Sequence, residues 1–161
     1  MARRVDRAED REPDEAEISV APRRRGIFGV PAPLVAAVAV GGALGAPARY
    51  ALSKAVHTPP NGFPWSTFVT NVSGSLLLGL LLTLIGERWA PTRFARPFAG
   101  TGFCGAYTTW STFMVDTDTL VKGAHVLVAA AYVAASLLVG LAAVYAGIVL
   151  GRLWPASKRR P

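Results

Sequence analysis

The sequence contains few acidic residues and one cysteine, and both scarcities exclude classes of protein. Charged residues make up 17% of the 161 residues, whereas soluble domains usually have about 25%. Residues 34–161 hold ten basic residues but only three acidic ones, Glu87, Asp116 and Asp118. Too few polar residues remain to build a second, soluble domain. The single cysteine, Cys104, excludes a disulfide framework and any metal site made of several cysteines.

Catalytic motifs are also absent from the sequence. There is no glycine-rich phosphate loop, no Ser/His/Asp set and no HExxH pair, so we do not expect an enzyme. His57 and His125 have no carboxylate or second histidine at the spacing of metal ligands, which favours ordinary surface histidines. The function is therefore sought in the apolar part of the chain.

Long apolar stretches dominate what is present. Hydrophobic residues account for 52% of the chain, and four stretches are each long enough for a helix of roughly 20 residues that crosses a bilayer. A helix that is apolar on all sides is either a membrane span or the core of a large protein, and this chain is too small to bury four of them. We therefore predict an all-α membrane protein with four transmembrane helices, at about residues 33–52, 64–85, 94–120 and 124–150.

The ends of the chain differ from this apolar part. Residues 1–32 have mixed charge and few apolar side chains, so we predict a disordered N-terminal tail. Residues 33–152 form the predicted four-helix transmembrane domain, and residues 153–161 a basic C-terminal tail. Arg23–Arg25, the next apolar stretch and Ala46-Pro47-Ala48 loosely resemble a signal peptide, but the apolar character continues past that point and favours a retained first helix.

Basic residues are unequally distributed over the segments that flank the spans. Four spans place both chain ends on one side of the membrane, and ten Lys and Arg residues lie on that side. Only Lys54 and Lys122 lie on the other side. Because basic flanking residues are retained on the cytoplasmic side, we predict that both termini are cytoplasmic. The ten are Arg23, Arg24, Arg25, Arg88, Arg93, Arg96, Arg152, Lys158, Arg159 and Arg160.

Polar residues inside the spans are the main indication of function, because they are costly in a bilayer. Thr67, Asn71 and Ser75 share one face of the second span, where they could hydrogen-bond neighbouring helices or form a site. Arg49, near the end of the first span, could be an interfacial anchor or the partner of an internal ion. Small residues that allow close helix packing are Gly41, Gly42, Gly45, Ala46, Gly74 and Gly79.

The third span is unusual because residues 100–113 read GTGFCGAYTTWSTF. Three glycines, four threonines and a serine make this segment a poor continuous helix. A break inside a membrane is tolerated where the freed main-chain groups are buried or line a cavity, and the ends of half-helices there can bind ions. The alternative is a helix that is only kinked and is packed by its neighbours. In the fourth span, Tyr132 and Ser136 are one turn apart.

These segments together resemble the CrcB/Fluc family of fluoride channels. The resemblance covers residues 33–152 and depends on GGALGAPARY (41–50), FPWSTFVTNVSGSLLLGLL (63–81), GTGFCGAYTTWSTF (100–113) and YVAASLLVG (132–140). It implies a four-helix subunit that pairs antiparallel with a second subunit, two narrow fluoride pores and a sodium ion, Na+, at the dimer centre. It also implies a passive channel in a bacterial plasma membrane that exports cytoplasmic fluoride and lowers its toxicity.

The resemblance further implies roles for individual residues. Asn71 matches an asparagine whose amide donates to fluoride, and Trp110 and Phe113 stand where the family has two pore phenylalanines. Amides and hydroxyls donate hydrogen bonds and ring edges carry partial positive charge, so such groups can replace the water around a small anion. No carboxylate belongs to the set, as an anion path requires. The implied pore residues are Arg49, Thr67, Asn71, Thr109, Trp110, Thr112, Phe113, Tyr132 and Ser136, and the implied sodium ligands are the main-chain carbonyls of Gly105 and Thr108.

Two departures from the family pattern lead to further predictions. Trp110 replaces the usual phenylalanine, and its larger ring with an N–H group could coordinate fluoride or narrow the pore. A subunit that inserts both ways should have little charge asymmetry, whereas ten basic residues against two predict one fixed orientation. We therefore predict pairing with a separate homologue of opposite topology, with a homodimer as the alternative.

Two other functions remain open at this point. One is an assembly subunit of a heterodimeric channel whose own pore is inactive or half-active. The other is a small multidrug-type transporter, which needs a carboxylate inside the membrane for proton coupling. The first two spans contain none before Glu87, and Asp116 and Asp118 are expected at the interface, which argues against this second alternative.

Overall fold

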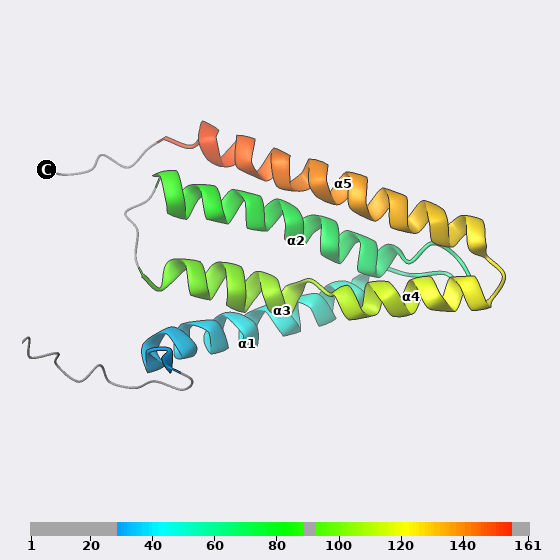
Figure 1. The fold of residues 1–161 in the computed structure, drawn as a ribbon, viewed down its shortest axis with the longest axis horizontal. Helices are drawn as coiled ribbons and strands as arrows, with labels where there is room; N and C mark the ends of the chain where they lie inside the picture. The colour runs from blue at the N-terminus through cyan, green and yellow to red at the C-terminus, as the bar shows by residue number, and fades with distance from the viewer. Residues whose placement is uncertain (1–28, 89–92, 156–161) are drawn as a thin grey trace, which may run out of the picture.

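The computed structural model describes residues 29–88 and 93–155, and all regular structure in these residues is helical (Figure 1). The described part contains no strand, in agreement with the predicted all-α class. Most of the predicted N-terminal tail, including Arg23–Arg25, lies outside the described residues, and so do Lys158, Arg159 and Arg160.

Three helices are long and apolar enough to cross a membrane, namely α1 (Ala32–Ala55), the continuous Trp65–Arg88 helix and α5 (Val126–Leu153). The Trp65–Arg88 helix consists of α2 (Trp65–Thr83) and a π-helical turn, η2 (Leu84–Arg88). Proline precedes α1 and α2, which suits a helix start because the first N–H groups have no helical partner there. Each of the three agrees with a predicted span to within a few residues.

The remaining apolar stretch is divided into three helical segments. These are η3 (Pro97–Cys104), α3 (Gly105–Tyr107) and α4 (Trp110–Lys122). Between α3 and α4, Thr108 and Thr109 have extended main-chain angles, with ψ of 163° and 117°. Since α4 has only 13 residues, the three segments reach the length of the other helices only together.

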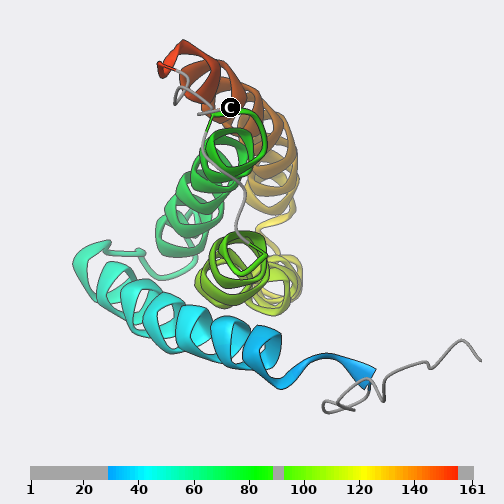
Figure 2. The same ribbon diagram turned by 90° about the vertical axis from the view of Figure 1, so that its left-hand side faces the viewer.

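The helices alternate in direction. The start of α1, the end of η2, the start of η3 and the end of α5 therefore lie at one end of the molecule, on the left in Figure 1. α2 packs mainly on α5, while α1 packs on η3 and α3. Figure 2 shows the η3–α4 segment between the α2–α5 pair and α1. Among the described residues, the basic ones at the left-hand end are Arg88, Arg93, Arg96 and Arg152, and those at the other end are Lys54 and Lys122.

Glycines allow the main chains of neighbouring helices to touch. A Cβ atom on Gly41 of α1 would overlap the carbonyl oxygen of Phe98 and lie 2.8 Å from the nitrogen of Phe103. A Cβ atom on Gly79 of α2 would overlap the carbonyl oxygen of Val144 in α5. Both contacts confirm the close packing that the sequence predicted for these small residues.

The outer surface of the helices is strongly apolar. α5 leaves several large side chains more than two-thirds exposed, although a water-soluble protein rarely exposes a continuous apolar face of this kind. This surface suits contact with lipid or with another subunit. The exposed side chains on α5 include Leu127, Leu138, Leu141 and Tyr145.

Replacing Gly41 by alanine should destabilise the protein, because the added methyl group would overlap main-chain atoms of η3. Overpacking of this kind costs about 1–3 kcal/mol of unfolding free energy. Gly42→Ala is the matched control, since the nearest atom to its new Cβ lies 3.9 Å away. Thermal unfolding of the purified protein in detergent compares the two variants. Equal melting temperatures would show that the contact between α1 and η3 is looser than described.

Candidate functional site

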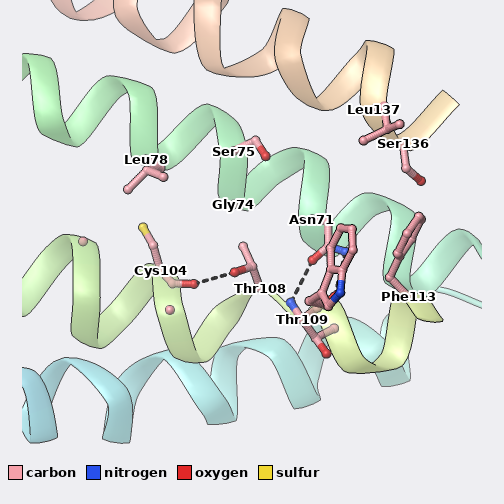
Figure 3. Close-up of a pocket in the computed structure, with 13 residues that line it drawn as sticks. Asn71, Gly74, Ser75, Leu78, Cys104, Thr108, Thr109, Phe113, Ser136 and Leu137 are labelled. Atoms are coloured by element: carbon pink, nitrogen blue, oxygen red, sulfur yellow. Dashed lines mark hydrogen bonds between the residues drawn. The ribbon is translucent and has the colours of Figure 1, made fainter. Parts of the chain in front are cut away.

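A cavity of about 360 Å³ lies where α2, α5 and the interrupted η3–α4 segment meet (Figure 3). Its walls combine amide, hydroxyl and aromatic groups with glycines and leucines. The lining residues are Asn71, Gly74, Ser75, Leu78, Gly100, Cys104, Gly105, Thr108, Thr109, Trp110, Phe113, Ser136 and Leu137.

The structure brings together seven of the residues that the sequence singled out. Five of the nine predicted pore residues line the cavity, and so do the two predicted sodium ligands, Gly105 and Thr108. The other four lie outside it, but three of them contact a residue that lines it. These four are Arg49, Thr67, Thr112 and Tyr132.

The interruption between α3 and α4 is held by Asn71 of α2. Its Nδ2 donates to the Thr109 carbonyl oxygen at 3.0 Å, and its Oδ1 accepts from the Thr109 N–H at 2.8 Å (Figure 3). The Thr109 hydroxyl then starts α4 as an N-cap, because it accepts from the Thr112 N–H at 3.1 Å. Asn71 therefore engages both main-chain groups at the point where the helix is broken.

Two hydrogen-bond donors in the cavity have no partner among the described residues. The amide nitrogen of Asn71 carries two hydrogens, and only one is used by Thr109. The Ser136 hydroxyl is buried and unpaired within residues 29–88 and 93–155. Buried polar groups usually find a partner, so these two donors indicate a place for an acceptor that the chain itself does not supply.

Arg49 of α1 reaches the interruption from another side. Its half-buried side chain donates from Nη1 to the Thr108 carbonyl oxygen at 3.4 Å. The contact places a positive charge beside the break. It favours an internal role for Arg49 over that of an anchor at the interface.

The carbonyl groups at the end of α3 have the chemistry of a site for a hard cation. The Thr109 N–H would pair with the Gly105 carbonyl in a continuous helix, but it donates to Asn71 instead. Carbonyl oxygens at such a helix end carry partial negative charge and can ligate sodium. Arg49 uses one of the two lone pairs of the Thr108 oxygen, which leaves the other for an ion. The donor set thus fits the sodium ion that the resemblance implies.

Trp110 and Phe113 form an aromatic wall of the cavity. Their ring centroids are 5.1 Å apart with the planes at 37°, and Phe113 lies 5.0 Å from the ring of Tyr132. Phe113 is only 5% exposed, whereas Trp110 is 70% exposed. The indole ring therefore stands at the open side of the cavity, with little cover from this chain.

Sequence reasoning missed the partner of Asp116. The half-buried carboxylate accepts a 2.6 Å hydrogen bond from the hydroxyl of Thr67 on α2. The prediction that no carboxylate accompanies the pore set was therefore wrong for Thr67. The spacing contained the signal, because Asp116 follows Phe113 by three residues and such residues share a helix face.

Two further lining residues were also overlooked. Gly100 and Cys104 precede Thr108 by two turns and one turn, so their helical spacing would have placed them on the cavity side.

Comparison with known proteins gives a consistent result. Residues 36–148 match the model of the family described as CrcB-like protein, Camphor Resistance (CrcB). The chain is 52% identical over 127 residues to fluoride-specific ion channel FluC 3 of Streptomyces avermitilis, a match that covers 79% of this chain but 62% of that relative. It is 41% identical to fluoride-specific ion channel FluC 2 of Nocardia farcinica, over 79% of this chain and 91% of the relative. A third relative, fluoride-specific ion channel FluC 1 of Mycobacterium tuberculosis, is 45% identical over 73% of this chain and 89% of the relative.

Replacing Asn71 by leucine should lower the stability of the fold, because the Thr109 N–H and carbonyl groups lose their partner. Leaving buried polar groups unpaired costs about 1–3 kcal/mol for each group. Ser75→Ala is the control, since Ser75 lines the same cavity from α2 and makes no hydrogen bond to the described residues. Thermal unfolding in detergent is the measurement. A leucine variant as stable as the parent protein would show that the hydrogen bonds from Asn71 to Thr109 do not stabilise the fold.

Proposed function

The chain belongs to the CrcB family, and from this we propose that it is a subunit of a passive fluoride channel in a bacterial plasma membrane. One observation carries the proposal. Two donors that have no partner among the described residues, the second amide hydrogen of Asn71 and the hydroxyl of Ser136, lie in one cavity with the rings of Trp110 and Phe113. The relatives named as fluoride-specific ion channels support it.

The donors in the cavity suit a small, strongly hydrated anion. Fluoride must exchange its water for other hydrogen-bond donors before it can pass a narrow site. Asn71 and Ser136 supply two such donors from the cavity wall. Thr112 lies outside the cavity, where its hydroxyl accepts from the Thr109 hydroxyl at 2.9 Å and keeps its own hydrogen for another acceptor. Donors that are already held in position can replace the hydration shell at a lower free-energy cost than donors on side chains that must first be ordered.

The aromatic rings add weaker but directed interactions. The edge of an aromatic ring carries partial positive charge, so Trp110 and Phe113 can stabilise a dehydrated anion that meets them edge-on. We propose that the path continues past Phe113 towards the buried ring of Tyr132, whose centroid lies 5.0 Å from that of Phe113. Thr67 donates to Asp116 in this structure, so its hydroxyl is not available to an anion.

Positive charge near the interruption would favour anion entry. Arg49 provides one such charge at the Thr108 oxygen. The Gly105 and Thr108 carbonyls would hold the sodium ion, which when bound adds a fixed positive charge at the dimer centre. Both charges act more strongly than they would in water, because the surrounding apolar helices screen them weakly.

The direction of transport follows from the acid–base chemistry of fluoride. Hydrogen fluoride crosses membranes as a neutral weak acid and ionises in the more alkaline cytoplasm. The trapped anion then leaves through a passive path down its own gradient, which lowers its concentration and toxicity. No energy source or coupling group is needed, and the family match gives no reason to retain the small multidrug-type alternative.

The channel is proposed to be an antiparallel dimer with a homologue of opposite topology. At one end of the described molecule lie four arginines, against two lysines at the other, so one orientation with both termini in the cytoplasm is favoured. The exposed face of Trp110 and the bare apolar surface of α5 leave room for a second subunit. A homodimer is the alternative.

Trp110 supports one further alternative, a subunit that is half-active or inactive. Its indole ring is 70% exposed at the open side of the cavity, where a larger ring than phenylalanine can narrow the path. In that case the dimer would conduct through a single working pore.

Fluoride efflux from liposomes tests the proposed function. The reconstituted protein, alone and then with its partner, should release fluoride and retain chloride. Ser136→Ala should slow fluoride efflux by roughly tenfold or more, because the anion loses a hydrogen bond and no bond within the chain is broken. Ser53→Ala is the control, since Ser53 lies on α1 outside the cavity. This variant should conduct fluoride as fast as the parent protein does. Chloride release as fast as fluoride release would refute fluoride selectivity, and normal efflux in Ser136→Ala would refute this site.

The orientation of the subunit is tested separately. A side-sensitive reporter fused to either terminus should give a signal only from the cytoplasm, because basic flanking segments stay on the cytoplasmic side of the membrane. Exchanging Arg93 and Arg96 for glutamine while adding two arginines to the loop between α1 and α2 should produce a mixed signal. Equal signal from both sides for the unaltered protein would point to a homodimer instead.

A further inference from the structure

A second cavity, of about 350 Å³, lies between α2 and α5 at the end where α5 finishes. Its floor is apolar and consists of Leu78, Leu82, Val144 and Ile148. None of the nine predicted pore residues lines it, and Leu78 is the one lining residue that it shares with the first cavity. An apolar cavity at the end of two membrane-spanning helices opens where the hydrocarbon of a bilayer meets its headgroups.

The rim of this cavity is charged. Arg152 forms two hydrogen bonds of 3.2 Å to the Glu87 carboxylate, and a guanidinium nitrogen of Arg88 donates to the main-chain oxygen of Arg152. Arg96 also lines the cavity, is exposed and makes no hydrogen bond or ion pair within the described residues. Two guanidinium groups, those of Arg96 and Arg152, therefore share the cavity lining with a single carboxylate, that of Glu87, which leaves an excess of positive charge.

Gly86 leaves space for the side chain of Arg96. A Cβ atom on Gly86 would lie 3.0 Å from the Nη2 atom of Arg96, so glycine at this position lets the guanidinium lie over η2. Arg96 thus lies beside the opening of the cavity, and none of its five N–H donors is used by residues 29–88 or 93–155.

We propose that this cavity binds one anionic phospholipid, with the phosphate on Arg96 and Arg152 and an acyl chain along the apolar floor. Basic pockets between membrane helices on the cytoplasmic side bind acidic lipid headgroups, and guanidinium groups pair with phosphate in a two-pronged geometry. A free phosphate ion would use the arginines but not Leu78, Leu82, Val144 or Ile148. The combination of a cationic rim and an apolar floor matches the whole lipid.

A second copy of this chain does not match the cavity equally well. In an antiparallel pair, the inverted copy would bring its own Lys54 and Lys122 to the level of Arg96 and Arg152. Like charges would then face each other, whereas a lipid phosphate brings the opposite charge.

Lipid binding to the full-length protein in detergent tests the proposal. Native mass spectrometry should detect one tightly retained phosphatidylglycerol per subunit and much weaker retention of phosphatidylcholine. Arg96→Gln should weaken the affinity for phosphatidylglycerol by about fivefold, the effect of one basic residue near a lipid surface. Arg96 has no partner to lose in the described part of the chain, so the variant should fold as the parent does, which its melting temperature checks.

Arg93→Gln is the matched control. Arg93 lies three residues earlier at the same end, is exposed, stacks on Phe94 at 4.7 Å and does not line the cavity, so its loss should leave the affinity unchanged. Equal weakening by both variants would show a general surface attraction and overturn the proposal. Equal retention of phosphatidylcholine, or displacement of the lipid by millimolar inorganic phosphate, would also overturn it.

Discussion

Two hydrogen bonds between the Asn71 side chain and the Thr109 main chain are the interaction on which the site depends. A membrane offers no water to a broken helix, so an unpaired main-chain group there costs several kcal/mol. An asparagine amide carries the same donor and acceptor as a peptide group, and it therefore replaces the missing partners at the break. Because Thr109 is held, α4 can start again immediately, and this places Trp110 and Phe113 on the cavity wall and leaves the carbonyls at the end of α3 free for other partners.

Close main-chain contacts fix the positions of the helices on either side of the Asn71–Thr109 hydrogen bonds. Gly79 brings α2 against α5, which sets the distance from Asn71 to Ser136 across the cavity. Gly41 brings α1 against η3, which sets Arg49 beside the break. Contacts between main chains have few ways to adjust, so the positions of the polar side chains follow from the packing of the helices. The site is thus built on rigid elements even though its centre is an interruption.

The sequence allowed much of this to be predicted, and the exceptions have physical reasons. Apolar length located the helices. Asn71 was identified because polar amides are costly inside a membrane, whereas Ser136 was assigned from the resemblance to the CrcB/Fluc family. The two hydrogen bonds between Asn71 and Thr109 could not be predicted, since helical spacing does not reveal which side chain contacts the main chain of a neighbouring helix. Asp116 was assigned from its distance along the chain alone, and its bond to Thr67 arises from the packing of α4 on α2. Tyr132 was placed by helical spacing, but Phe113 separates its ring from the cavity.

Leu78 lines the cavity that contains Asn71 and also the cavity rimmed by Arg96 and Arg152. The two cavities therefore have one wall residue in common. A change in the rotamer of Leu78 would alter the shape of both. The centre of the protein and its basic end are for this reason mechanically linked through one leucine.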